Sequence, residues 1–164
     1  MANISLIRID SRLIHGQVIT KWVKIAKANR IIIIIDDELA QDDFMASIYT
    51  ASAPKGISVE IISVDDALKT WGEDQMGKGE LLILFKDAQS CHRMYKGGLP
   101  MKKLQIGGLP SASGRKTILR AVSMDQEDFE KLKEISDSGS EVYIHIIPEE
   151  PRMDFEKIEK KMKE

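Results

Sequence analysis

The sequence predicts an α/β fold: a mostly parallel, seven-stranded sheet with helices on both faces, forming an open three-layer sandwich. Apolar runs flanked by charged residues recur along the chain, with longer stretches of helical spacing between most of them. This pattern is typical of alternating strands and helices. The five consecutive isoleucines at positions 31–35 leave no polar face, as expected for a central strand buried on both sides. A length of 164 residues with 43% hydrophobic side chains suits one domain over residues 1–164.

Seven apolar runs are predicted to be the strands of this sheet. They span residues 4–9, 31–35, 58–63, 81–85, 103–106, 117–121 and 142–147. The isoleucines of the second run are β-branched, which favours extended backbone. The fifth and sixth runs lie too close together for a helical crossover, so a loop or tight turn is predicted between them.

The spacing of apolar residues predicts helices between and after the strands. The first begins near Gly16, because Val18, Trp22 and Ala26 recur on one side while lysines occupy the other. The remaining helices span residues 41–53, 65–75, 88–95, 126–138 and 153–162. Pro54 and Gly139 follow two of these stretches and are predicted to end them.

Charge and composition narrow the classes of function. The net charge of −2 supplies no positive field for nucleic acid or acidic membrane lipid, which favours a small soluble partner. The single cysteine, Cys91, excludes an internal disulfide framework and a multi-cysteine zinc site, and suits a reducing compartment. The longest apolar run is far shorter than the roughly 20 residues of a membrane span, and residues 1–10 do not resemble a signal peptide. A cytoplasmic protein is therefore expected.

The loop after the first predicted strand, residues 10–17, concentrates reactive side chains. It contains Asp10, Arg12 and His15, followed by Gly16. A neutral imidazole nitrogen can attack phosphorus, and a phosphoryl group on His15 would lie where unpaired N–H groups open a helix. Arg12 would bind the phosphoryl oxygens, and Asp10 would orient the ring by accepting a hydrogen bond from its other nitrogen. This chemistry requires no metal, and the same residues also fit an ordinary loop histidine.

Two further features concern cofactors and the rim of such a site. The chain contains neither GxGxxG nor GxxxxGK[ST], so tightly bound NAD or ATP is not expected. The stretch 107–116 opens with Gly107 and Gly108, which would let the backbone approach a ligand at the rim. It continues with two hydroxyls and two cations: Ser111, Ser113, Arg115 and Lys116. The alternative interpretation is a flexible connection whose glycines only shape a turn.

Residues 8–18 read RIDSRLIHGQV and resemble the active-site segment of enzyme IIB in the mannose/fructose/sorbose family of the phosphoenolpyruvate-dependent sugar phosphotransferase system. Three further segments resemble that family in the same order and at similar spacing. They are IIIIIDDELAQDD from Ile31, SAPKGISVEIISVDDAL from Ser52 and LQIGGLP from Leu104. Together they cover most of the chain, so the resemblance does not depend on one motif.

This resemblance implies a phosphocarrier. In that family the histidine matching His15 accepts a phosphoryl group on Nδ1 from a phosphohistidine of the IIA partner. It passes the group to a sugar that enters through the membrane components IIC and IID. Arg12 and Asp10 match the arginine and aspartate of the family motif, whereas many relatives carry Asp at the position of Ser11. The implied protein is a cytoplasmic transferase that associates peripherally with the membrane through IIC and IID.

The resemblance also implies a hexose or amino sugar of the mannose, fructose, sorbose and N-acetylgalactosamine class, and it is nearest to relatives serving N-acetylgalactosamine. A homodimer is compatible with the family, and the sequence does not specify it. Two other classes of function stand beside this one. The first is a regulatory binding module, in which phosphorylated His15 changes affinity for a partner and no sugar is modified. The second is a nucleotide-binding α/β enzyme, which the missing glycine motifs disfavour.

Overall fold

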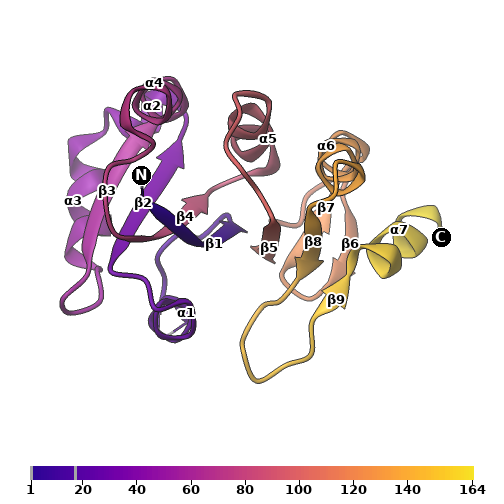
Figure 1. Cartoon of the computed structure of the whole chain (residues 1–164). Helices are drawn as coiled ribbons and strands as arrows, with labels where there is room; N and C mark the ends of the chain where they lie inside the picture. The colour runs from indigo at the N-terminus through magenta and orange to yellow at the C-terminus, as the bar shows by residue number, and fades with distance from the viewer. Residues whose placement is uncertain (1, 17) are drawn as a thin grey trace.

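The computed structural model describes residues 2–16 and 18–164, except for the side chains of Asp37 and Leu39. Within these residues the central sheet contains seven strands. The strands are β1 (Asn3–Asp10), β2 (Arg30–Ile35), β3 (Ser58–Ser63), β4 (Glu80–Phe85), β5 (Lys103–Gly108), β8 (Glu141–Ile144) and β9 (Met153–Asp154). Their order across the sheet is β3-β2-β4-β1-β5-β8-β9 (Figure 1). Neighbouring strands are parallel except β8 and β9, which are antiparallel.

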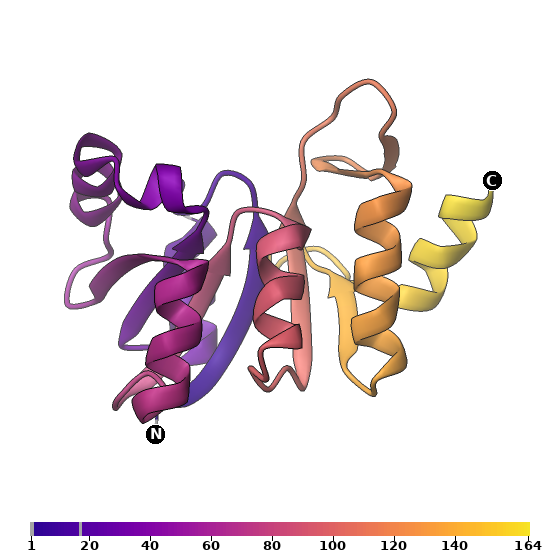
Figure 2. The same cartoon turned by 90° about the horizontal axis from the view of Figure 1, so that it is seen from above.

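Helices cover both faces of this sheet, as the sequence predicts. They are α1 (Val18–Ala26), α2 (Asp37–Ala40), α3 (Asp43–Ala51), α4 (Val64–Asp74), α5 (Ala88–Lys96), α6 (Gln126–Asp137) and α7 (Phe155–Lys163). The helices α4, α5 and α6 lie on one face, and α1 lies on the other (Figure 1 and Figure 2). The predicted α/β class is thus confirmed. Among the described residues, no helix has both the length and the apolar character required to cross a membrane.

The isoleucines of β2 contribute to both hydrophobic layers of the core. Ile32 and Ile34 pack into the cluster beneath α4, α5 and α6. The other three, at odd positions, pack into the cluster that contains Trp22 of α1. Successive side chains of a strand point to opposite faces, so a strand without a polar residue requires an apolar layer on each side. All five isoleucines are buried, which confirms the predicted central strand.

The prediction that residues 117–121 form a strand of the central sheet is wrong. In the structure β6 (Lys116–Leu119) pairs antiparallel with β7 (Val122–Met124) in a separate two-stranded sheet. The chain reverses through Arg120 and Ala121, and the positive φ of 67° at Ala121 is incompatible with a continuing strand. The seventh place in the central sheet belongs to β9, whose two residues were predicted to begin the last helix.

Two predicted boundaries also differ from the structure. The helix predicted over residues 41–53 is shorter in the structure, where α3 spans only Asp43–Ala51. It begins at Asp43 because the side chain of Asp42 accepts a hydrogen bond from the N–H of Met45 and caps this end. The strand predicted over 142–147 ends at Ile144. Beyond it, the carbonyls of His145 and Ile146 accept hydrogen bonds from the side chain of Arg8.

Cys91 lies on α5 in the hydrophobic core, and its burial raises the pKa of the thiol. Because the thiolate is the reactive form of cysteine, we expect the folded protein not to react with Ellman's reagent. Unfolding in guanidinium chloride should expose one reactive thiol per chain, measured by the absorbance of released thionitrobenzoate. Rapid reaction of the folded protein would contradict this placement of Cys91.

The ends of β1, β4 and β5 lie at the carboxyl edge of the sheet, and β1 is the middle strand of the three. After β1 the chain passes to α1 on one face, and after β4 it passes to α5 on the other (Figure 1 and Figure 2). Ligand sites in open α/β sheets lie where successive crossovers change face in this way. The topology therefore places the expected site at the loop after β1.

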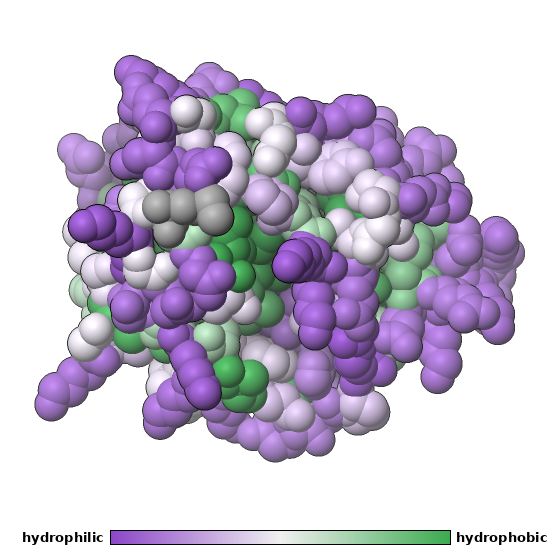
Figure 3. All heavy atoms as spheres, viewed as in Figure 1, coloured by the Kyte–Doolittle hydropathy of each residue, from purple (hydrophilic) through white to green (hydrophobic). Residues whose placement is uncertain are grey.

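A groove of about 540 Å³ is lined by residues of β1, α1, β5 and β8, among others. Leu6 and Trp22 supply apolar surface, and Gln105 and Tyr143 supply polar groups. Figure 3 shows apolar side chains in the middle of one face of the molecule, surrounded by hydrophilic ones. The groove borders Arg8, because Gln105 in its wall is a hydrogen-bond partner of that arginine.

Candidate functional site

The loop after β1 turns back and brings His15 over the end of its own strand. The N–H of Leu13 donates a hydrogen bond of 2.9 Å to the carbonyl of Asp10. Leu13 has a φ of 57° and Gly16 a φ of 52°, so two residues in the left-handed region reverse the chain. The side chain of Leu13 is buried in the core, and this burial offsets the cost of its backbone conformation.

The carboxylate of Asp10 is the centre of the site. It is fully buried and has three residues as partners. Its Oδ1 accepts hydrogen bonds from the backbone N–H and from Nε of Arg12, both at 3.0 Å. Its Oδ2 accepts from Nη2 of Arg12 at 3.0 Å and from Nη2 of Arg8 at 3.2 Å, and it lies 3.1 Å from Nε2 of His15. The structure therefore brings the predicted residues Asp10, Arg12 and His15 together and adds Arg8.

The two arginines keep Asp10 ionised in spite of its burial. Burial alone would raise the pKa of the Asp10 carboxyl, but the hydrogen bonds from Arg12 and the charge of Arg8 outweigh it and hold the pKa below its ordinary value. Asp10 is therefore a hydrogen-bond acceptor at neutral pH. An acceptor beside Nε2 favours the ring tautomer that carries its proton on that nitrogen.

His15 is left with its other ring nitrogen available for chemistry. With the proton on Nε2, the lone pair resides on Nδ1, for which the described part of the chain provides no hydrogen-bond partner. The side chain is 24% exposed, so a molecule in solution can reach the ring. A histidine oriented by a buried carboxylate has the arrangement of an activated nucleophile.

The two arginines at the site differ in exposure. The side chain of Arg12 is 44% exposed, whereas that of Arg8 is 1% exposed. Arg12 can therefore reach an anion bound at the surface, and Arg8 cannot. Arg8 is a residue of the site that was not predicted from the sequence. The sequence feature that could have indicated Arg8 is its position two residues before Asp10, which places both side chains on the same face of β1.

Gly107 and Gly108 lie beneath this network and not in a loop at its rim. Both are buried inside β5, so the loop predicted to start at Gly107 is wrong at its first two residues. A Cβ atom at Gly107 would lie 2.0 Å from Cζ of Arg8, and one at Gly108 would lie 2.7 Å from Oδ1 of Asp10. The buried guanidinium and carboxylate therefore require residues without side chains on the neighbouring strand.

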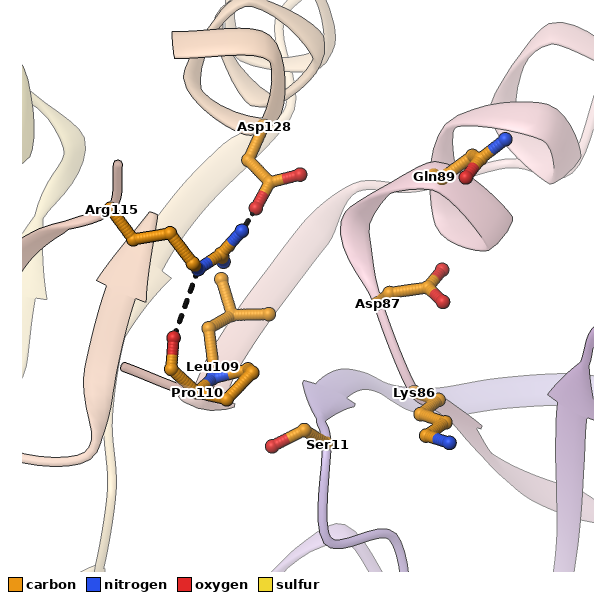
Figure 4. A pocket seen from close by; sticks show the side chains of 8 residues that line it. All are labelled: Ser11, Lys86, Asp87, Gln89, Leu109, Pro110, Arg115 and Asp128. Carbon is orange, nitrogen blue, oxygen red and sulfur yellow. Dashed lines mark hydrogen bonds and ion pairs between the residues drawn. The ribbon is translucent and has the colours of Figure 1, made fainter. Parts of the chain in front are cut away.

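A hollow of about 260 Å³ lies beside the loop, at the ends of β1, β4 and β5 (Figure 4). Its lining residues are Ser11, Lys86, Asp87, Gln89, Leu109, Pro110, Arg115 and Asp128. In Figure 4 Arg115 extends along one wall, where it donates to Asp128 at 2.7 Å and to the carbonyl of Pro110 at 2.9 Å. Arg115 therefore anchors the 109–116 segment to α6.

The other polar residues predicted in that segment are not drawn into the Asp10 network. Ser111 and Ser113 are exposed, and Lys116 donates to the carbonyl of Glu164. Within residues 2–16 and 18–164, no hydrogen bond or ion pair joins these three side chains to Asp10. The candidate site is thus the loop after β1 with its support from β5.

Comparison with known proteins gives this site a family context. Residues 4–164 match the family model described as PTS system sorbose subfamily IIB component, where PTS stands for phosphotransferase system. The sorbose-specific EIIB component of Lacticaseibacillus casei is 34% identical and aligns over 93% of this chain and 92% of its own length. The N-acetylgalactosamine-specific enzyme IIB component 2 of Escherichia coli strain K12 is 30% identical over 96% of this chain and 99% of its own length.

The fold is shared with solved structures as well. The crystal structure of manxB from Thermoanaerobacter tengcongensis has a TM-score of 0.89 and 39% sequence identity, covering 98% of this chain and 96% of that one. Relatives named for different sugars are thus similar to nearly the same degree. The comparison does not single out N-acetylgalactosamine, the sugar to which the sequence resemblance pointed.

Proposed function

Because this chain belongs to the sorbose subfamily of PTS IIB components, we propose that its His15 accepts a phosphoryl group from a phosphohistidine of IIA and passes it to a sugar. The family supports the general role in sugar phosphotransfer, with IIA and the membrane components IIC and IID as partners. The observation that carries the residue assignment is the contact between Oδ2 of Asp10 and Nε2 of His15. It leaves Nδ1 as the nucleophile on a partly exposed ring.

In the first step, the lone pair of Nδ1 attacks the phosphorus of the donor phosphohistidine. A new N–P bond forms while the donor's N–P bond breaks, and the donor imidazole leaves with the electron pair. The ring of His15 gains positive charge as Nδ1 bonds to phosphorus. Asp10 stabilises that charge through Nε2, in the way a buried carboxylate supports an imidazolium.

Arg12 and the start of α1 are the groups proposed to hold the phosphoryl oxygens. Arg12 carries a permanent charge on a planar fork that suits phosphoryl groups. Gly16 lies two positions before Val18, where α1 begins, and the first turn of that helix contains no acidic side chain. Unpaired N–H groups and the helix dipole favour an anion there.

In the second step, a sugar hydroxyl attacks the phosphorus, the N–P bond to His15 breaks, and the electron pair returns to Nδ1. The hydroxyl proton passes to solvent or to a group on the membrane component. We propose a hexose or amino sugar of the mannose, fructose, sorbose and N-acetylgalactosamine class as the acceptor, presented by IIC and IID. The partly exposed ring of His15 suits a carrier that must meet two partners in turn.

A reconstituted system tests this function. The purified chain is incubated with IIA that carries a 32P-labelled phosphohistidine, and then with membranes that contain IIC, IID and one sugar of the class. We expect the label to appear on the chain and then on one of the sugars. A labelled chain with no transfer to any sugar would favour the regulatory module, and an unlabelled chain would exclude both.

Replacing Arg12 with alanine is expected to slow phosphorylation of His15 by roughly 100-fold, the usual effect of losing one donor to a developing anion. Single-turnover labelling by phosphorylated IIA measures the rate. Arg93→Ala is the matched control, because the Arg93 side chain is 46% exposed on α5 and forms a surface ion pair with Asp65. An unchanged rate in Arg12→Ala would remove Arg12 from the mechanism.

A further inference from the structure

We propose that Arg8 is a positioning residue for phosphoryl transfer, which holds Asp10 in the place where Asp10 orients the ring of His15. This inference rests on the proposed phosphocarrier function and extends it to a residue that no phosphoryl group can touch. Arg8 is among the largest fully buried side chains of the described residues. Its effect on the reaction must therefore pass through its neighbours.

The partners of Arg8 fix its guanidinium from several directions. Nη1 donates to Oε1 of Gln105 and, at 2.8 Å, to the carbonyl of His145. Nη2 donates to the carbonyl of Ile146 at 3.1 Å and to Oδ2 of Asp10 at 3.2 Å. Arg8 thus connects β1, β5 and the segment after β8, and it presents one N–H group to the carboxylate.

Arg8 and His15 meet at the same oxygen of Asp10. Nη2 of Arg8 lies 3.2 Å from Oδ2, and Nε2 of His15 lies 3.1 Å from it. Arg12 binds both oxygens of the carboxylate as well, but it is exposed and has to serve an incoming phosphoryl group. When Arg12 turns toward that group, Arg8 is the cation that remains on Asp10. A buried, immobile partner is what a carboxylate needs in order to keep its orientation through the transfer.

The surrounding chain is arranged to accommodate this buried charge. Gly107 leaves room for the guanidinium, since any Cβ there would overlap Cζ of Arg8. Trp22 of α1 lies with its ring centroid 5.4 Å from Cζ of Arg8, and its Nε1 donates to the carbonyl of Ile146. Burial lowers the pKa of Arg8, and the charge and hydrogen bond of Asp10 act against that shift. Such a pair contributes little net stability compared with apolar packing, which favours a role in positioning.

Arg8→Met tests the proposal with a side chain that fills much of the same space without charge or donors. Phosphoramidate serves as the phosphodonor, so that docking of a partner protein does not affect the rate. We expect labelling of His15 to slow about 10- to 100-fold, as for loss of an outer-shell partner. In 15N-resolved NMR spectra of the ring, the fraction of His15 with its proton on Nε2 should fall. Arg8→Lys should restore part of the rate, because it returns the charge without the fork.

Arg30→Met is the matched control. Arg30 is a second arginine of the sheet, with a partly buried side chain, and it donates to the carbonyl of Met76 and to Glu60 at the other end of the strands. Its loss should lower stability and leave both the labelling rate and the ring spectrum of His15 unchanged. A similar slowing in Arg30→Met and Arg8→Met would mean that any buried arginine of the sheet has this effect, and it would overturn the proposal.

The outcomes separate this inference from the function on which it rests. If the wild-type chain is not labelled at His15, the phosphocarrier function itself fails. If the wild-type chain is labelled and Arg8→Met is labelled equally fast with the same ring tautomer, only the role of Arg8 fails. If Arg8→Met does not fold, Arg8→Lys and Gln105→Met decide the question. Wild-type rates in both would overturn the proposal, and slower rates with a changed ring spectrum would support it.

Discussion

Replacement of His15 with alanine is expected to abolish incorporation of phosphate from phosphorylated IIA and to leave the fold intact. The side chain is partly exposed and contacts the carboxylate of Asp10, so its loss removes the nucleophile and little of the packing. The drop should reach the detection limit, because no other group of the loop supplies an imidazole nitrogen. Filter-bound 32P after brief incubation measures the incorporation, and circular dichroism checks the fold.

The chain offers a matched control for this variant in its other histidines. His92 lies on α5, with Nε2 3.2 Å from Oε2 of the exposed Glu134. His92→Ala should therefore incorporate phosphate at the wild-type rate. Normal labelling of His15→Ala, or loss of labelling in His92→Ala, would place the phosphoryl group elsewhere.

Asp10→Asn is expected to have the largest effect on stability. The change leaves the charge of Arg8 buried without its counter-ion, and breaking a buried pair in this way costs about 3–5 kcal/mol in the free energy of unfolding. It also removes the charge that fixes the tautomer of His15, so phosphate incorporation should fall as well. Urea unfolding at neutral pH measures the stability. Asp65→Asn is the control, because that carboxylate forms an exposed ion pair with Arg93 and its loss should have little effect.

The stability difference caused by Asp10→Asn should depend on pH in a defined direction. The pKa of Asp10 is lower in the folded chain than its ordinary value of 3.8. The carboxylate therefore stabilises the fold at pH values above that ordinary value, and this contribution is lost as the pH falls through the folded pKa. The gap between wild type and variant should be largest near neutral pH and shrink below about pH 4. A gap that is constant or grows in acid would contradict the ionised state of Asp10.

The strands and the reactive loop could be predicted because their signals are local. The isoleucines of β2 occupy adjacent positions, and Asp10, Arg12 and His15 fall within six residues. The tight turn at Leu13 and Gly16 then places the imidazole on the carboxylate. Periodicity and short-range chemistry are enough to indicate such features.

The support beneath the loop could not be predicted, because it depends on pairing between distant strands. Arg8 reads as an interruption of an apolar run until the register places it beside Gln105 and below Gly107. Paired glycines at the end of a strand have the composition of a loop, so the sequence predicts a loop at Gly107 and Gly108. The short strand β9 was missed since two residues carry no period.

Identification of the ring nitrogen of His15 that carries the phosphoryl group tests the central claim most directly. The phosphorylated chain, with 15N in its histidine rings, is analysed by 31P and 1H–15N correlation spectra that distinguish the two ring positions. The contact of Nε2 with Asp10 predicts phosphorus on Nδ1 of His15, with the proton retained on Nε2. Phosphorus on Nε2 of His15, or on His92 or His145, would contradict the account.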